Sequence, residues 1–309
     1  MAKPLPLWKT HEAESLQPFS KIRLIVADLD GTTLKPSKQL LYATIQKLRR
    51  DLFHHRYNVN FTIATGRTFE GASALLKSIS LPRKMPIILY NGSLVVGKAK
   101  ETVYLKRSIP ITGLRRVIDI CSAYPVRVLA YYFQDFTDRI FRSSRPLEYV
   151  LGWSRVRQPE REFNNMIVRW HNDIPSFEDH QPLAILIDTS EAPNMAEEIE
   201  CKMNDINEIT VTRSGSSYIE LRPKGSNKGE AIKRLAELLE LKRDEVLAFG
   251  DNDNDVEMLS WAGIGVAVAG ASSMALESSN YVCRYGVSKG AVELLRLIKN
   301  ARRYYYLVS

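Results

Sequence analysis

The stretch 21–34, KIRLIVADLDGTTL, constrains the fold of this chain more than any other feature. Its first part is apolar apart from Arg23, which is typical of a strand buried on both faces of a parallel sheet. The strand ends at Asp28 and Asp30, and an extended backbone sends both carboxylates toward the same side. Gly31 then lets the chain turn away. Two acids therefore stand at the carboxyl end of a strand, where open α/β sheets bind ligands.

Length and composition allow two domains of ordinary globular protein. The 309 residues include 45% hydrophobic and 25% charged residues, close to the globular average. No run approaches the ~18 apolar residues of a membrane span, and the opening residues lack the apolar core of a signal peptide. We therefore expect a cytoplasmic protein without membrane contact, with residues 1–20 as an ordered or partly ordered N-terminal tail.

Cysteine spacing and charge carry less information. Cys121, Cys201 and Cys283 are spaced too widely for a disulfide framework or a Cys-x-x-Cys metal site, and we predict three buried thiols. The net charge of +8 is uneven: residues 98–169 hold fourteen Lys and Arg against seven acids, whereas residues 173–208 hold one Lys against ten acids. These are either two solvated faces of one domain or an electropositive surface that faces an anionic substrate.

The pattern up to Gly92 predicts the first half of a doubly wound parallel sheet. Each predicted strand is short and apolar and ends in polar residues, first at Asp28 and then at Thr65 and Asn91. After the first strand, the predicted elements are a helix capped by Ser37 that runs to Leu48, a strand over 59–64, a helix over 69–78 and a strand over 86–90.

From Ser93 the pattern changes to alternating segments, which are typical of antiparallel α+β structure. We assign residues 93–221 to an inserted α+β cap, and residues 21–92 with 222–309 to one core domain. The parallel-sheet pattern returns after Pro223. The elements predicted in these two regions are helices over 111–121, 196–203, 230–239, 274–278 and 288–300, and strands over 183–187, 209–212, 218–221, 245–249 and 263–268.

Four motifs stand in order along the chain: DLDGT at 28–32, Thr65 in ATGR, Lys228 in NKG, and GDNDND at 250–255. The first motif resembles that of the haloacid dehalogenase superfamily. With the insertion between the second and third motifs, the chain from Lys21 to about Asn300 resembles the Cof-type phosphatases. The resemblance implies a Rossmann-like core with an α+β cap. It also implies a Mg²⁺-dependent phosphoric monoester hydrolase that acts on small phosphorylated metabolites, such as sugar phosphates.

The two acids of the first motif have different expected roles. Asp28 would be the nucleophile, which forms an aspartyl phosphate and so splits one hard hydrolysis into two easier steps. Asp30 would protonate the leaving oxygen and then deprotonate water. Carboxylates this close are expected to push their titrations apart, so that one is ionised while the other holds a proton.

Mg²⁺ prefers oxygen ligands in an octahedron. Asp28 and Asp251 fit as carboxylate ligands, and the resemblance adds the main-chain carbonyl of Asp30. Asp255 would either orient Lys228 or sit behind the metal. For Asp253 we favour a charge at a helix N-terminus.

Thr65 and Lys228 would bind the phosphoryl oxygens, with help from Asn254. Two Lys-Gly pairs open predicted helices, and we choose Lys228 over Lys289 because its helix leads directly into the strand that ends at Gly250. The supporting site residues are Gly31, Thr32, Gly66, Arg67, Asn91, Gly92 and Asp255.

Several alternatives stay open. Arg67 is either a helix-start ion-pair partner or a site residue. A phosphomutase would keep the same nucleophile, and the fold could also serve as a non-catalytic phosphometabolite-binding or regulatory module. The presence of every expected catalytic residue type argues against the module, and the absence of a basic-aromatic motif argues against nucleic-acid binding. We therefore expect a small phosphorylated substrate, no nucleic-acid partner, and a monomer or homodimer.

Overall fold

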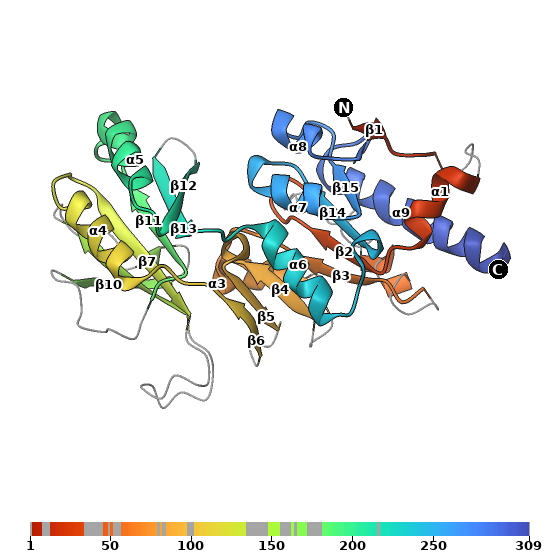
Figure 1. Cartoon of the computed structure of the whole chain (residues 1–309), viewed down its shortest axis with the longest axis horizontal. Coiled ribbons are helices and arrows are strands. Elements are labelled where there is room, and N and C mark those ends of the chain that lie inside the picture. Colours follow the sequence, from red (N-terminus) through yellow and green to blue (C-terminus); the bar gives the residue numbers. More distant parts are fainter. Residues whose placement is uncertain are drawn as a thin grey trace. The chain divides into compact units, whose positions relative to one another are not determined.

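The computed structural model describes residues 2–7, 13–33, 46–48, 50–51, 57–78, 81, 85–97, 102–133, 148–154, 162–163, 166–171, 181–214 and 217–308. The chain forms two compact units (Figure 1). The first unit comprises Met1–Gly66, Lys77–Gly92 and Asn227–Ser309, and the second comprises Arg67–Leu76 and Ser93–Ser226. No helix among the described residues is long and apolar enough to span a membrane.

The first unit contains a parallel sheet with strand order β1-β16-β15-β14-β2-β3, as predicted for a doubly wound core. The central strands β2, β14 and β15 are entirely buried, which explains their continuous apolar runs, whereas β1 is exposed and β16 half-buried. A parallel bridge between Ala64 and Ile88 continues the sheet to β4. The strands are β1 (Lys3–Pro4), β2 (Leu24–Ala27), β3 (Asn60–Ile63), β4 (Pro86–Leu89), β14 (Val246–Gly250), β15 (Ile264–Ala267) and β16 (Tyr281–Val282).

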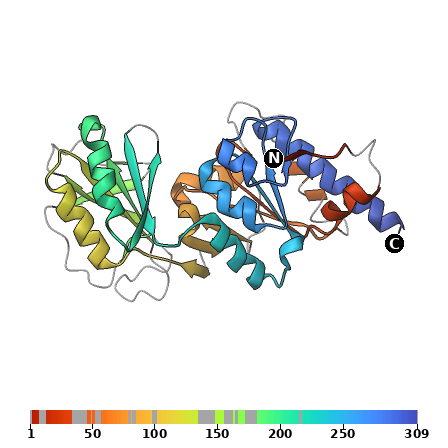
Figure 2. The same ribbon diagram turned by 45° about the horizontal axis from the view of Figure 1, so that its top comes forward.

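Helices cover both faces of this sheet. The long helix α9 packs on the face that carries Ala27 and Phe249, where Leu294 and Leu295 close a small apolar cavity. Helices α6 and α7 contact each other and lie on the other side of the sheet (Figures 1 and 2). The helices of this unit are α1 (Ala13–Ser20), α6 (Lys228–Leu238), α7 (Val256–Trp261), α8 (Ser273–Glu277) and α9 (Val287–Val308), with 3-10 turns at Tyr90–Gly92, Arg243–Glu245 and Asp253–Asp255.

Both ends of the chain contain regular structure. In the described part of the N-terminal segment, β1 pairs with β16 and α1 contacts α9, which agrees with an ordered or partly ordered tail. Leu5 and Phe19 are fully buried there. Helix α9 continues to Val308 rather than ending near residue 300, since Ala301 is buried and Arg302 Nη2 donates to the carbonyl of Ile22 at 2.9 Å.

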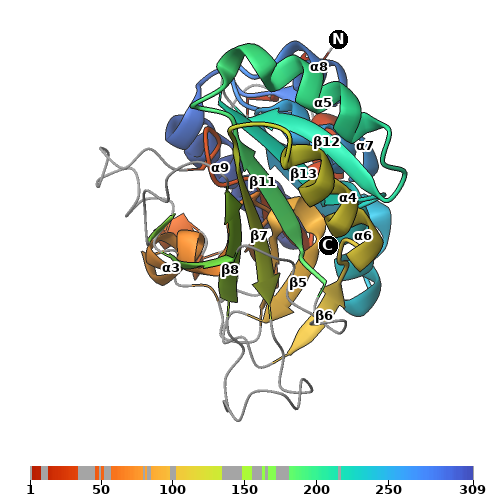
Figure 3. The ribbon, with the colours of Figure 1, turned by 90° about the vertical axis from the view of Figure 1, so that its left-hand side faces the viewer.

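The second unit contains a sheet with strand order β12-β13-β11-β7-β8-β10-β9. All neighbouring strands are antiparallel except β8 and β10, which are parallel. Helices α4 and α5 lie over one face (Figure 3) and bury a large apolar core there. The strands are β7 (Arg127–Phe133), β8 (Glu148–Ser154), β9 (Glu162–Phe163), β10 (Met166–His171), β11 (Ala184–Asp188), β12 (Ile209–Ser214) and β13 (Tyr218–Pro223).

Shorter elements complete this unit. The hairpin of β5 (Leu94–Gly97) and β6 (Val103–Lys106) is antiparallel with a bulge. The helices are α3 (Phe69–Ser78), whose residues 69–76 belong here, α4 (Ile111–Cys121) and α5 (Ala196–Asn204), with a 3-10 turn at Pro193–Met195. The predicted class, a doubly wound core with an additional α+β region, is therefore confirmed. The helix predicted from Ser37 to Leu48 lies largely outside the described residues.

The three cysteines are free, but only two are buried. Cys121 and Cys283 are buried, as predicted. The prediction is wrong for Cys201, which is exposed. It lies on α5, whose buried residues Ile199 and Met203 face the core, so a residue between them on the helix points outward.

Candidate active site

The two acidic strand ends lie side by side. β2 and β14 are parallel neighbours, with Ala27 paired to Phe249, and Asp28 N–H donates to the Phe249 carbonyl at 2.8 Å. Asp28 is 5% exposed. The carboxyl ends of neighbouring parallel strands meet at one edge of a sheet, so the motifs at Asp28 and at Asp251 come together as the sequence predicted.

Lys228 lies at the centre of this group. It is the first residue of α6, whose N-cap Asn227 accepts from Glu230 N–H at 2.8 Å. Its Nζ atom donates to Asp28 Oδ1 and to Asp255 Oδ1, each at 2.6 Å. The side chain is fully buried. Lys289, the alternative considered from sequence, is exposed on α9.

Asp255 has both carboxylate oxygens engaged. Oδ1 accepts from Lys228, and Oδ2 accepts from the N–H groups of Asp251 at 2.9 Å and Asn252 at 3.1 Å. A Cβ at Gly250 would lie 2.6 Å from Asp255 Oδ2, so a side chain there would displace this carboxylate. The geometry favours Asp255 as the residue that orients Lys228. Asp253 begins the 3-10 turn that leads into α7, where we placed a helix N-terminal charge.

The first turn after β2 holds Asp251 in place. Thr32 Oγ1 donates to Asp251 Oδ1. Gly31 has φ +83°, and a Cβ at this position would lie 2.2 Å from Asp251 Oδ2. The glycine is therefore needed both for its backbone conformation and for the close approach of Asp251. Thr33, which the sequence interpretation did not single out, donates its hydroxyl to the Asp28 carbonyl.

Burial dominates the electrostatics of the acids. It is the largest cause that raises the pKa of Asp28 to about 7; Lys228 lowers this pKa, and Asp255 and Asp251 raise it. The expectation that Asp28 and Asp30 push each other's titrations apart stays a prediction. Burial also raises the pKa of Asp251, and Asp30 is near enough to contribute to that shift.

The pKa of Lys228 reflects two opposing effects. Burial is the largest and would lower it, but the charges of Asp28 and Asp255 outweigh burial and raise the pKa above the ordinary lysine value. The ammonium therefore stays charged at neutral pH and provides a fixed cation beside Asp28.

The acids form a candidate metal centre. Among the described residues, Asp28, Asp251 and Asp255 can each offer an oxygen, and these oxygens lie within 4.8 Å of one another. Lys228 donates to one oxygen of Asp28, and Thr32 donates to one oxygen of Asp251. Both oxygens of Asp255 accept hydrogen bonds. An all-oxygen donor set with raised carboxyl pKa values suits a hard divalent cation.

Thr65 and Asn254 extend the site to the neighbouring strands. Thr65 is fully buried at the end of β3, and its carbonyl accepts from Asn91 N–H at 3.0 Å. Asn254 Nδ2 donates to Asn91 Oδ1 at 3.1 Å. Asn91 has φ 51°, the left-handed region that asparagine tolerates. A Cβ at Gly66 would lie 2.9 Å from the Asn91 amide, and one at Gly92 would lie 2.1 Å from the backbone of Asn227.

Two predicted residues are exposed. Asp30 lies at the turn after β2. The Nη1 atom of Arg67 donates to the Gly71 carbonyl in the first turn of α3 at 3.0 Å. Both interpretations of Arg67, at the helix start and in the site, stay predictions.

A family model described as haloacid dehalogenase-like hydrolase matches residues 25–295, which is most of the chain. The chain belongs to this family. The matched range includes all four motifs of the haloacid dehalogenase-like hydrolases, and the resemblance to the Cof-type branch inferred from those motifs is confirmed. The chain is accordingly an enzyme of the hydrolase class.

Two curated phosphatases match this chain over nearly their whole length. The chain is 25% identical over 283 residues to the 5-amino-6-(5-phospho-D-ribitylamino)uracil phosphatase YitU of Bacillus subtilis, covering 90% of this chain and 97% of the relative. It is 24% identical to the pyridoxal phosphate phosphatase YbhA of Escherichia coli, with 84% and 92% covered. A haloacid dehalogenase-like hydrolase from Bacteroides thetaiotaomicron shares the fold, with a TM-score of 0.71, 21% identity, and 90% and 99% covered.

Proposed function

We propose that this hydrolase is a Mg²⁺-dependent phosphatase of small phosphorylated metabolites that works through an aspartyl phosphate on Asp28. The observation that carries the proposal is the fully buried ammonium of Lys228, held 2.6 Å from Asp28 Oδ1. A cation fixed there offsets the repulsion between a carboxylate and a phosphate monoester. The relatives YitU and YbhA, named for phosphatase activities, support the same reaction class.

The first step forms the phosphoenzyme. One oxygen of Asp28 attacks phosphorus, and the bond from phosphorus to the ester oxygen breaks. Asp30, which is exposed at the turn after β2, gives its proton to the leaving oxygen. Lys228 holds Asp28 in position, and Asp255 holds Lys228.

The second step restores the enzyme. Asp30, now ionised, takes a proton from water as the water oxygen attacks phosphorus. The bond to Asp28 breaks, inorganic phosphate leaves, and both carboxyl groups return to their starting states. Thr65, Lys228 and Asn254 would bind the phosphoryl oxygens in both steps, and Asn91 fixes the Asn254 amide, which carries two N–H donors.

Mg²⁺ fits the residues that are present. Its ligands would be the carboxylates of Asp28 and Asp251 and, as expected from the family resemblance, the carbonyl of Asp30. When bound, Mg²⁺ supplies positive charge that offsets the negative charge gathering on the transferred phosphoryl group. Asp255, engaged by Lys228 and two N–H groups, would stand behind these ligands.

Removal of the metal tests the proposal. Dialysis against EDTA should bring turnover of p-nitrophenyl phosphate down to background, and added Mg²⁺ should restore it. Ca²⁺ should restore it poorly, because it accepts looser and higher coordination than in-line transfer requires. Full turnover in EDTA would contradict the proposal. A screen of phosphorylated metabolites by kcat/KM, beginning with sugar phosphates, would then identify the substrate.

The remaining parts of the proposal come from sequence alone. Residues 93–221 would act as the cap that contacts the leaving group, and the protein would be cytoplasmic. It would act as a monomer or homodimer on a small phosphorylated substrate, with no nucleic-acid or membrane partner.

A further inference from the structure

Arg222 is a buried cation in the second unit. Its side chain is 6% exposed, and its Nε atom has no hydrogen-bond partner. It takes part in none of the ion pairs between described residues, whereas Arg213 in the neighbouring strand β12 pairs with Glu200 at 3.0 Å. An unpaired buried charge is costly, so a native protein that keeps one calls for an explanation such as a ligand.

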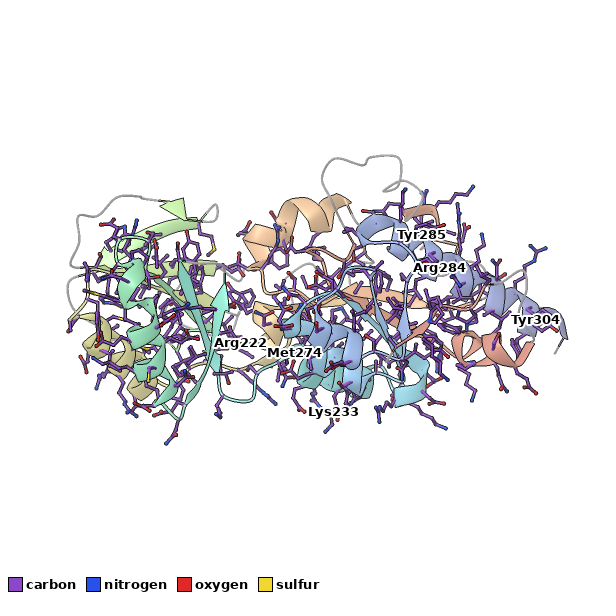
Figure 4. The ribbon with its side chains drawn as sticks, turned by 90° about the horizontal axis from the view of Figure 1, so that it is seen from above. Arg222, Lys233, Met274, Arg284, Tyr285 and Tyr304 are labelled. Carbon is purple, nitrogen blue, oxygen red and sulfur yellow. The ribbon has the colours of Figure 1, made fainter. Side chains whose placement is uncertain are left out.

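The strand pattern places Arg222 on the face of the sheet away from the helices. Leu221 lies in the core beneath α4 and α5, and successive side chains of a strand alternate between faces. Arg222 comes next along β13 (Figure 4). Thr210 pairs with it on β12, and the pairing of Ile185 with Leu221 brings Ala184 opposite it on β11. Both neighbours have short, uncharged side chains.

Two buried serine hydroxyls belong to the same unit as Arg222, and one of them, on Ser226, follows it by four residues. Ser226 is in the turn that follows β13, where its N–H donates to the Pro223 carbonyl at 3.0 Å. Ser93 precedes β5, and Arg107 joins the two segments: its N–H donates to the Ser93 carbonyl at 2.8 Å and its Nη1 to the Gly225 carbonyl at 2.7 Å. Within the described chain, neither serine hydroxyl has a hydrogen-bond partner.

We propose that Arg222, Ser226 and Ser93 form a binding site for a small oxyanion, a phosphate or a carboxylate. A guanidinium offers N–H donors in a planar fork that matches two oxygens of such a group. The hydroxyls add two further donors. One bound oxyanion would neutralise the buried charge and satisfy the three polar groups that the described residues leave unsatisfied. All three residues belong to the second unit, whereas the group around Asp28 belongs to the first.

Thermal melting in EDTA, with sodium malonate or sodium phosphate as the added anion, tests this site. The wild-type Tm should rise by about 3–5 °C per tenfold increase in anion above Kd. Arg222→Met keeps the side-chain stem and removes the charge, and it should lose most of the rise with at least one anion. Without anion it should melt no lower than wild type, because the unpaired charge is gone. Arg213→Met is the matched control and should keep the full rise.

Equal rises in wild type and Arg222→Met with both anions would overturn the proposal. If Arg222→Met fails to fold, Arg222→Lys is the deciding variant, because it keeps the positive charge but loses the planar set of guanidinium N–H donors. A response weakened several-fold in Arg222→Lys supports the site, and an unchanged response overturns it.

Kinetic measurements show whether the site binds a free anion or an acidic group of the substrate. This test rests on the proposed phosphatase function. 3-Phosphoglycerate carries a carboxylate that glycerol 3-phosphate lacks. If the site binds the substrate, Arg222→Met should lower the ratio of the two kcat/KM values at least ~10-fold. If Arg222→Met leaves the ratio of the kcat/KM values unchanged but loses the rise in Tm with added anion, the site binds a free anion. If wild type hydrolyses neither ester, the melting result alone decides the site, and the proposed function is judged separately by turnover of p-nitrophenyl phosphate with and without EDTA.

Discussion

Lys228 has an environment that few lysines share. It is fully buried, and the carboxylates of Asp28 and Asp255 each lie 2.6 Å from its Nζ atom. Burial alone would drive a lysine toward the neutral form, but here two acids keep the pKa raised. Its removal would leave two buried carboxylates facing each other, so we expect structural and catalytic consequences together.

The first prediction compares the two Lys-Gly pairs of the sequence. Lys228→Met should lower kcat/KM at least ~10²-fold by removing a charge aimed at the transferring group. It should also lower stability by about 3–5 kcal/mol, the usual cost of breaking a buried pair. Lys289→Met, at an exposed position of α9, should change neither quantity much. Kinetics and melting on variants checked by circular dichroism measure both, and the reverse ranking would mean that the wrong lysine is assigned to phosphate binding.

Alanine substitutions at two glycines with similar backbone angles distinguish the effect of backbone strain from the effect of a close contact. Gly31 has φ +83° and Gly270 has φ +84°, but an added Cβ meets Asp251 Oδ2 at 2.2 Å in the first and nothing within 4 Å in the second. Both alanine variants should lose ~1 kcal/mol or more to strain. Only Gly31→Ala should also raise the Mg²⁺ concentration that half-activates the enzyme, by at least ~10-fold. Equal metal dependence in the two variants would show that Asp251 is not a ligand.

The motif residues could be predicted from sequence because short local patterns determine them. A buried strand that ends in acids needs no tertiary information beyond the parallel order of the strands, and β2 and β14 are indeed neighbours. The dominance of burial in the pKa of Asp28 could not be predicted, because it depends on how many atoms surround one carboxyl group. The contact of Arg67 with its own helix likewise depends on a side-chain conformation.

Among the helices and strands, the longer segments were predicted more accurately from sequence than the shortest ones. Helices α3 and α4 have the predicted bounds, since about three turns of apolar periodicity set them. The two-residue strands β1 and β16 escaped notice because alternation cannot be seen in two residues. Helix α9 was predicted too short because the aromatic end of the chain gives no clear periodic signal, whereas its packing against α1 depends on the tertiary structure.

Adjacent arginines near the end of α9 test whether this extension stabilises the fold. Arg302 is half-buried, and its Nη2 donates to the Ile22 carbonyl at 2.9 Å, whereas Arg303 is exposed. Arg302→Ala should lower the free energy of unfolding by about 1–3 kcal/mol, because a buried acceptor loses its donor. Arg303→Ala should stay within about 0.5 kcal/mol of wild type. Calorimetry on the two variants measures this, and equal effects would mean that the end of α9 is frayed in solution.

For the whole molecule, thiol reactivity reports whether both units are folded. Cys201 is exposed on the second unit, Cys121 is buried in the same unit, and Cys283 is buried in the first. Burial raises the pKa of Cys121 to about 12 and raises that of Cys283 as well, so neither forms much thiolate near neutral pH.

At pH 8 we therefore expect one thiol to react with Ellman's reagent in the native protein and three in guanidinium. Cys201→Ser, the control, should remove the fast reaction completely. Fast reaction of two or three native thiols would contradict the burial of Cys121 or Cys283.

The central claim is that Asp28 carries the phosphoryl group and Asp30 moves the proton. Asp30→Asn leaves attack possible but removes proton transfer, which is worth roughly 10²–10⁴-fold per assisted step. p-Nitrophenyl phosphate has a leaving group that needs no protonation, so it should still phosphorylate Asp28 in this variant. Hydrolysis of the intermediate, which needs a base, should then be slow, and the phosphoenzyme should accumulate.

Mass spectrometry of the intact protein after mixing with p-nitrophenyl phosphate and Mg²⁺ tests this most directly. We expect one added phosphoryl group, stable in acid and removed by hydroxylamine, on Asp30→Asn and none on Asp28→Asn. A label on Asp28→Asn but not on Asp30→Asn would contradict this mechanism and reverse the two roles. Turnover by wild type with a label on neither variant would also contradict it and indicate direct attack by water.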